Sequence, residues 1–214
     1  MTDSLEGLLW CGGALLATSV AAIVLARLRA GSAIVYGIAL GVSATALAIA
    51  LTFLLTGNSL TGALTLPLGL PWLGAHFRLD ALAAFFLVVV NLGSATASLF
   101  GLGYGRHEQA PGRVLPFFPA FLAGMDLVVL AGDAFTFLFT WELMSLSSWA
   151  LVMAHHRRSG NAAAGFLYLI MASFGTLALL LAFGLLAGSA GDYAFQGMRA
   201  APPAPGMAGA GRAA

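Results

Sequence analysis

The sequence predicts an all-α, polytopic integral membrane protein with about six transmembrane helices. Of its 214 residues, 60% are hydrophobic and only 8% are charged, and the mean hydropathy is +0.96. Soluble domains contain roughly 25% charged residues, so this composition excludes an ordinary soluble fold. Several apolar runs are also long enough to cross a hydrocarbon core, which takes about 20 helical residues.

Six apolar runs define the predicted spans. They cover approximately residues 7–26, 33–55, 81–102, 114–130, 134–154 and 162–186. Asp3 and Glu6 precede the first run and arginines follow it, the reverse of a secretory signal, so we expect a retained span. The fourth run is the shortest, and its Pro116 and Pro119 fit the first turns, where amide hydrogens have no helical partner. Asp133 is the expected N-cap of the fifth span.

Two segments outside the spans have their own character. Residues 57–78 combine glycine, proline and alternating apolar residues, which predicts an extended or hairpin excursion at the interface with Trp72 as an anchor. Residues 191–214 are mostly alanine, glycine and proline, so we expect a disordered tail. The predicted organisation is therefore helices one to three in residues 1–114, helices four to six in residues 115–190, and the tail.

The arginines predict the orientation of the chain. They gather in the first, third and fifth connections, as Arg27 and Arg29, Arg106 and Arg113, and Arg157 and Arg158. The positive-inside rule then makes these loops cytoplasmic and leaves the N-terminus outside. We expect a multi-pass protein of the cell inner, or cytoplasmic, membrane.

Glu142 is the charged residue that most needs an explanation. It lies nine residues into the fifth span counting from Asp133, or ~13.5 Å along a helix, near the middle of a core about 30 Å thick. An acid there costs on the order of 2.5 to 3.5 kcal/mol, so it is expected to face protein or water, with the Ser145 hydroxyl one turn away. Burial disfavours the ionised carboxyl and a nearby cation favours it, so moving that cation would switch the group. A proton-transfer site is favoured, and a neutral acid making one interhelical hydrogen bond is the alternative.

Asp126, in the fourth span, raises the same question. If spans four and five form a hairpin, Asp126 lies at nearly the depth of Glu142 and is a candidate relay group. A helix cap or an aqueous vestibule is the alternative place for this carboxyl.

The remaining polar residues of the spans have mainly structural interpretations. Asn91, Ser94 and Ser98 share one face of the third span and are expected to hydrogen-bond between helices. His155 and His156 begin a basic cluster that is most simply a solvated helix end. Proton uptake through His155 or His156 is the functional alternative.

Other functions are disfavoured by what the sequence lacks. All nine basic residues are arginine, so a Walker-type phosphate loop and a Schiff-base lysine are excluded within this chain. Four histidines and one cysteine are too few and too scattered for a metal cage, iron–sulfur cluster or haem, so we expect no cofactor. A net charge of +1 gives no reason to expect a nucleic-acid partner.

The order of the motifs resembles a known family. WELMSLSSWALV, preceded by AGMDLVVLAGDAFTFLF, follows RLDALAAFFLVVVNLGSATASLFGLGY and comes before GFLYLIMASFGTLALLLAFGLLAG. Over about residues 5 to 195 this pattern is similar to the antiporter-like subunits of complex I and membrane-bound hydrogenases, above all hydrogenase-4 component B and formate hydrogenlyase subunit 3. The resemblance implies that Glu142 is a central proton-channel residue. It also implies inverted helical repeats with coupling lysines, of which residues 115–190 would supply only the start.

The expected function is therefore that of a proton-translocating membrane subunit. It would couple electron transfer by a hydrogenase or an NADH:quinone oxidoreductase to proton transport, beside other membrane subunits and without a redox centre of its own. The chain would be a truncated or split form, or a partner would supply the remaining helices. The alternatives are a subunit of a sodium/proton antiporter and a structural membrane scaffold without transport.

Overall fold

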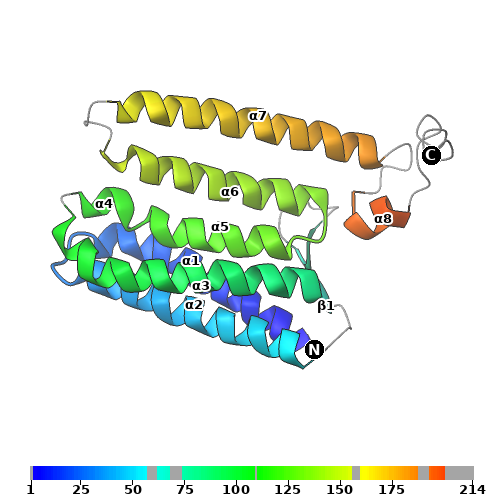
Figure 1. The fold of residues 1–214 in the computed structure, drawn as a ribbon, viewed down its shortest axis with the longest axis horizontal. Coiled ribbons are helices and arrows are strands. Elements are labelled where there is room, and N and C mark those ends of the chain that lie inside the picture. Colours follow the sequence, from blue (N-terminus) through cyan, green and yellow to red (C-terminus); the bar gives the residue numbers. More distant parts are fainter. Residues whose placement is uncertain are drawn as a thin grey trace, which may run out of the picture.

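The computed structural model describes residues 2–56, 62–67, 74–108, 110–155, 160–187 and 193–200. Six long helices lie roughly side by side (Figure 1): α1 (Thr2–Leu25), α2 (Gly31–Leu55), α3 (Ala81–Tyr104), α5 (Phe117–Leu130), α6 (Ala134–Val152) and α7 (Asn161–Ala187). In the described part of the chain, six segments are long and apolar enough to cross a membrane, which confirms the predicted polytopic all-α fold. Helices α5, α6 and α7 follow one another away from the group formed by α1, α2 and α3.

The fourth span differs from its predicted bounds. A short helix α4 (Pro111–Val114) comes first, and α5 begins at Phe117 rather than near residue 114. Pro116 occupies the N-cap position of α5, because a residue without an amide hydrogen cannot continue the ladder from α4. Two short 3₁₀ turns are also present. One, Gly105–His107, follows α3, and the other, Met153–His155, follows α6.

The connection between α2 and α3 contains the predicted hairpin. Strands β1 (Gly62–Leu66) and β2 (Ala75–Leu79) pair antiparallel, with Gly62 opposite Leu79. Alternate residues of β2 are buried, and Phe77 and Leu79 join the apolar core. Trp72, the predicted anchor, lies outside the described residues.

The turn between α5 and α6 fastens this hairpin to the helices. Asp133 is the N-cap of α6, as predicted, and its Oδ1 accepts a hydrogen bond from the Thr136 amide at 2.8 Å. The other oxygen, Oδ2, accepts from the His76 amide at 3.0 Å. The Gly132 amide donates to the His76 carbonyl at 2.7 Å. One short turn therefore holds β2 and caps α6.

The same turn binds the segment after α7, which corrects one prediction. The Phe195 amide donates to the Gly132 carbonyl at 3.1 Å, and helix α8 (Phe195–Ala200) starts there. The Phe195 ring lies 5.6 Å from the ring of Phe183 and 6.2 Å from that of Phe137. The predicted disorder of residues 191–214 is therefore wrong for residues 193–200, because Phe195 supplies an apolar anchor. Residues 201–214 lie outside the described part.

Burial is uneven across the bundle. Fully buried side chains gather where α1, α2, α3 and α5 meet, as Leu8, Leu15, Leu87 and Leu130 show. On α7 only Gly165 and Ala187 are buried. The apolar outer faces of α7 are thus available to lipid or to further membrane helices.

Candidate functional site

The candidate site is built where α5 packs against α6. A Cβ added to Gly124 would lie 2.8 Å from Cα of Met144, so the two backbones cross closely at this point. The helices run antiparallel. Asp126 lies two residues closer than Gly124 to the turn that joins them, and Glu142 lies two residues closer than Met144. The hairpin therefore places both acids at the same level, as predicted.

Asp126 is enclosed by protein. It is 3% exposed, and the Asn91 side-chain amide on α3 donates to its Oδ1 at 2.7 Å. The same nitrogen of Asn91 also donates to the Leu87 carbonyl at 3.1 Å. The alternative of a helix cap or vestibule is therefore wrong, because this carboxyl is held inside the bundle. Asn91, predicted to join helices, makes that link through an acid.

Glu142 is half-buried and faces α7. The Thr176 hydroxyl donates to Glu142 Oε1. It also lies 3.2 Å from the carbonyl of Ala172, four residues earlier on α7. Ser145, predicted as the neighbouring hydroxyl, is buried on α6, but the recorded hydroxyl bond of Glu142 is with Thr176. The acid therefore makes an interhelical hydrogen bond within the spans.

Thr176 is the site residue that sequence reasoning missed. The contact between Gly165 and Met153 fixes α6 and α7 as an antiparallel pair. Continuing that register about three turns from the connection reaches Thr176 opposite Glu142. This register comes from the packing of Gly165 on Met153 and is not specified by the apolar pattern of the two spans.

The two acids at the same level point to different neighbours. Asp126 bonds toward α3, whereas Glu142 bonds toward α7 on the far side of α6. The structure thus brings their backbones together but directs their carboxyls apart. A relay between them would need intervening groups.

The recorded charge pairs lie at the ends of helices. They join His76 with Asp133, Arg78 with Asp80, and His155 with Glu108. The sequence has no arginine between residues 113 and 157, and no lysine at all. A cation for Glu142 must therefore come from another part of the chain or from another subunit. In the described residues no group of three or more His, Cys, Asp or Glu side chains could hold a metal ion.

The predicted proton-uptake cluster is described only in part. His155 Nε2 lies 3.0 Å from Glu108 Oε1, and its backbone carbonyl accepts from the Asn161 side chain at 3.0 Å. These contacts tie together the loops after α3 and α6. His156 lies outside the described residues.

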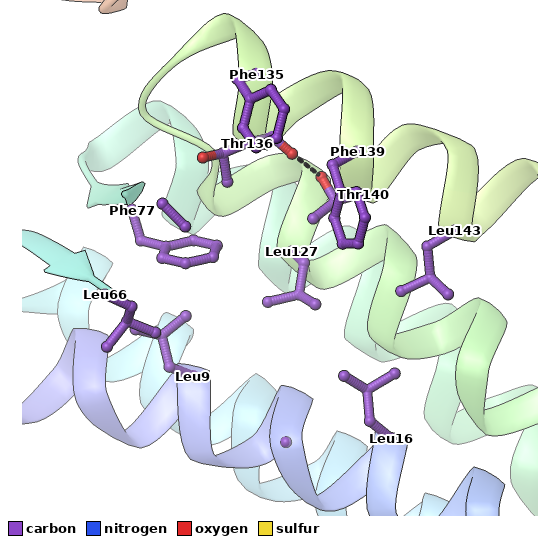
Figure 2. Close-up of a pocket in the computed structure, with 12 residues that line it drawn as sticks. Leu9, Leu16, Leu66, Phe77, Leu127, Phe135, Thr136, Phe139, Thr140 and Leu143 are labelled. Atoms are coloured by element: carbon purple, nitrogen blue, oxygen red, sulfur yellow. Dashed lines mark hydrogen bonds between the residues drawn. The ribbon is translucent and has the colours of Figure 1, made fainter. Parts of the chain in front are cut away.

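A cavity of about 430 Å³ lies between α1, the hairpin, α5 and α6 (Figure 2). Leu9, Phe77 and Leu127 line it, and the Thr140 hydroxyl donates to the Thr136 carbonyl at 2.8 Å rather than into the space. Neither candidate acid borders this cavity. Its apolar walls suit hydrocarbon and offer no groups for proton transfer.

Comparisons with known proteins match this chain to one group. Residues 131–208 match the family described as "NADH:quinone oxidoreductase/Mrp antiporter, TM". Hydrogenase-4 component B of Escherichia coli (strain K12) is 34% identical over 135 residues, 62% of this chain and 20% of that protein. The NADH-quinone oxidoreductase subunit N of Rhizorhabdus wittichii is 28% identical over 184 residues, 84% of this chain and 36% of that protein. The structure of the Mrp complex from Dietzia sp. DQ12-45-1b includes a chain that matches with a TM-score of 0.71 and 26% identity, over 91% of this chain and 36% of that one.

The chain is similar in sequence and fold to the antiporter-like subunits of the complex I and membrane-bound hydrogenase superfamily. It is a multi-pass membrane protein, and its relatives are components of multi-subunit membrane complexes. This antiporter-like chain spans 20% of the hydrogenase component and 36% of the subunit N relative.

Proposed function

We propose that this antiporter-like chain is a proton-translocating membrane subunit in which Glu142 is the proton-transferring carboxyl. The observation that carries the proposal is the position of Glu142 well inside α6, where Thr176 of α7 donates a hydrogen bond to it. Both helices lie within the matched family region, residues 131–208. Acids within membrane spans usually line ion or proton pathways, because a polar group there is costly without a function.

The contact with Thr176 suits both protonation states of Glu142. A threonine hydroxyl donates to an ionised carboxylate and can accept from a protonated acid. The carboxyl therefore keeps a partner when it gains or loses a proton. Helices α5 and α6 contain no arginine or lysine. The cation that would favour the ionised form of Glu142 therefore belongs to a neighbouring helix or a partner subunit.

The proposal extends to the assembly and its orientation. The chain would work in a cell inner membrane with its N-terminus outside, beside other membrane subunits that couple hydrogenase or NADH:quinone oxidoreductase electron transfer to proton movement. Residues 115–190 would form the start of the proton-translocating repeat. The names of the two relatives and the arginine distribution support this proposal.

The test measures proton pumping in inverted membrane vesicles from cells that make the chain with its native neighbours. Glu142→Gln should abolish acidification driven by the electron donor while leaving the amount of assembled complex unchanged. Glu6→Gln is the matched control, because Glu6 is exposed near the start of α1 and should pump normally. Normal pumping by Glu142→Gln would reject the proposal and favour a structural scaffold.

The likeness to the Mrp complex favours a second candidate, a subunit of a sodium/proton antiporter. In that case vesicles should exchange sodium for protons without any electron donor. Glu142→Gln would then abolish sodium-dependent proton release, and no hydrogenase activity would accompany the assembled complex.

A further inference from the structure

Five buried polar side chains between α2 and α3 carry an oxygen without a hydrogen-bond partner among the described residues. They belong to Ser32, Ser43, Asn91, Ser94 and Ser98. The exposure of Ser43, Asn91 and Ser98 is 0%, and that of Ser94 is 3%. The large majority of buried side-chain polar atoms in folded proteins have a protein or water partner. We call the interface between α2 and α3 that holds these five side chains the seam. Five exceptions in one interface need a common explanation.

Several threonine hydroxyls elsewhere in the spans are satisfied locally. Thr18, Thr45 and Thr140 each donate to the carbonyl four residues earlier, at 2.7, 2.8 and 2.8 Å. The side chains of Ser94 and Ser98 do not make this bond to their own helix. Their oxygens are thus left available to a partner in the seam.

The register of α2 against α3 arranges these groups in a row. A Cβ on Gly105 would lie 2.5 Å from Ser32 Oγ, and one on Gly101 would lie 2.4 Å from the Tyr36 ring. Continuing this antiparallel register by about two turns places Ser94 opposite Ser43. Figure 1 shows the two helices side by side along their length.

The row connects a buried acid with one end of the bundle. At the end of the row that lies inside the bundle, Asn91 donates to Asp126 Oδ1 at 2.7 Å, while Asn91 Oδ1 itself has no recorded partner. At the opposite end of the row, Ser32 lies in the first turn of α2, beside the end of α3. Glu108 is close by, paired with His155 at 3.0 Å.

We propose that the seam between α2 and α3 holds a file of bound water molecules that connects Asp126 with the membrane surface at the Ser32 end. Buried waters usually make two to four hydrogen bonds to polar groups that otherwise lack partners, and this seam presents such groups at successive turns. Water in the file would carry protons to and from the Asp126 carboxyl. The idea deepens the proposed function by giving this acid a route, but hydration of the seam does not depend on transport by Glu142.

The experiment measures thiol reactivity in the full chain in membranes. Cys11 is first replaced by alanine, and single cysteines are introduced as Ser43→Cys, Ser94→Cys and Ser98→Cys, each close in size to the serine. The probe is a small water-soluble methanethiosulfonate, followed by mass spectrometry. The thiolate is the reactive species, and its formation requires a polar, hydrated site.

Two control positions on α3 define a dry site. Leu87 is fully buried on the same face as Asn91, and Thr96 is exposed on the outer face of the helix within its apolar length. We expect the three seam cysteines to react about tenfold faster or more than Leu87→Cys and Thr96→Cys, because apolar surroundings suppress the thiolate. Ser98→Cys should react faster than Ser94→Cys, since it lies nearer the Ser32 end.

Equal reaction rates at the seam and control positions would overturn the proposal, because the serines would then lie in a dry interface. Size-exclusion chromatography before labelling shows that each variant is folded, and Ser43→Cys on α2 tests the seam independently of changes in α3. Adding Glu142→Gln should leave the labelling unchanged. A dry seam and a failure of Glu142 to transport protons are therefore separate results.

Discussion

The bond between Asp126 and Asn91 joins α5 to α3 through two buried polar groups. Asp126 is 3% exposed and Asn91 is 0% exposed, so neither side chain gains bulk water if its partner is lost. Removing one member of a buried hydrogen bond leaves the other with its full desolvation cost. Replacing both side chains should therefore cost less stability than the sum of the two single replacements.

Asp126→Leu and Asn91→Leu should each lower the free energy of unfolding by about 1–3 kcal/mol, because each leaves an unpaired polar group. The double variant should lose less than the sum of the two. Thermal unfolding of the purified chain in detergent gives the three values for a double-mutant cycle. Additive losses would show that the recorded bond contributes nothing.

Glu142 should behave differently, since its acid is costly within the spans. Glu142→Leu should insert and fold at least as well as the unaltered chain, because an acid at the centre of a span costs on the order of 2.5 to 3.5 kcal/mol. Thr176 retains its bond to the Ala172 carbonyl. The measurement is the yield in the membrane fraction and the elution profile in detergent. A variant that fails to insert would assign Glu142 a structural role instead.

Between elements, glycines set how closely the helices approach. A Cβ on Gly124 would meet backbone and side-chain atoms of Met144 at 2.8 to 3.0 Å, whereas one on Gly93 of α3 would meet nothing within 4 Å. Gly124→Ala should therefore push α5 and α6 apart and cost about 1–3 kcal/mol, as overpacking typically does. Gly93→Ala is the matched control and should unfold at or above the unaltered temperature. Equal stability of the two variants would show that the contact with Met144 relaxes freely.

Element by element, the sequence predicted what depends on long apolar runs and local caps. The six spans, the hairpin after α2 and the Asp133 cap follow from composition and turn chemistry, and the structure has all three. The hydrogen-bond partners of the acids depend instead on register between helices, which similar apolar faces do not specify. Asn91 was therefore assigned only a general interhelical role, and Thr176 was missed. The folding of residues 193–200 was missed because one phenylalanine outweighs an otherwise structureless composition.

For the molecule as a whole, the orientation remains a prediction from the arginines. In a chain with Cys11 replaced by alanine, a cysteine at Arg29 should be protected from an impermeant thiol reagent in intact cells. A cysteine at Thr56, exposed at the opposite end of α2, should react. After the cells are broken, both should be labelled. Labelling of Arg29→Cys alone in intact cells would reverse the orientation.

The bundle as a whole supplies the Glu142 carboxyl but not the nearby cation that would change its protonation state. Glu142 faces α7, whose outer side is open, and the chain contains no lysine. A buried carboxyl moves protons across a membrane only if a nearby charge alternately favours its two protonation states and water reaches it from both sides. Asp126 bonds on the other side of the α5–α6 pair, toward α3, and so does not complete a path through Glu142.

We therefore expect the purified 214-residue chain in liposomes to conduct no more protons than lipid alone. Conduction should require a further chain or segment that places a cation against α7, because the ionised and protonated forms of Glu142 would otherwise not be driven to exchange. The measurement uses a pH dye trapped inside the liposomes and a membrane potential set with potassium and valinomycin. Glu142→Gln is the matched control and should show the same background leak. A proton current that the unaltered chain carries and Glu142→Gln lacks would contradict the expectation, and would mean that these six helices already form a complete path.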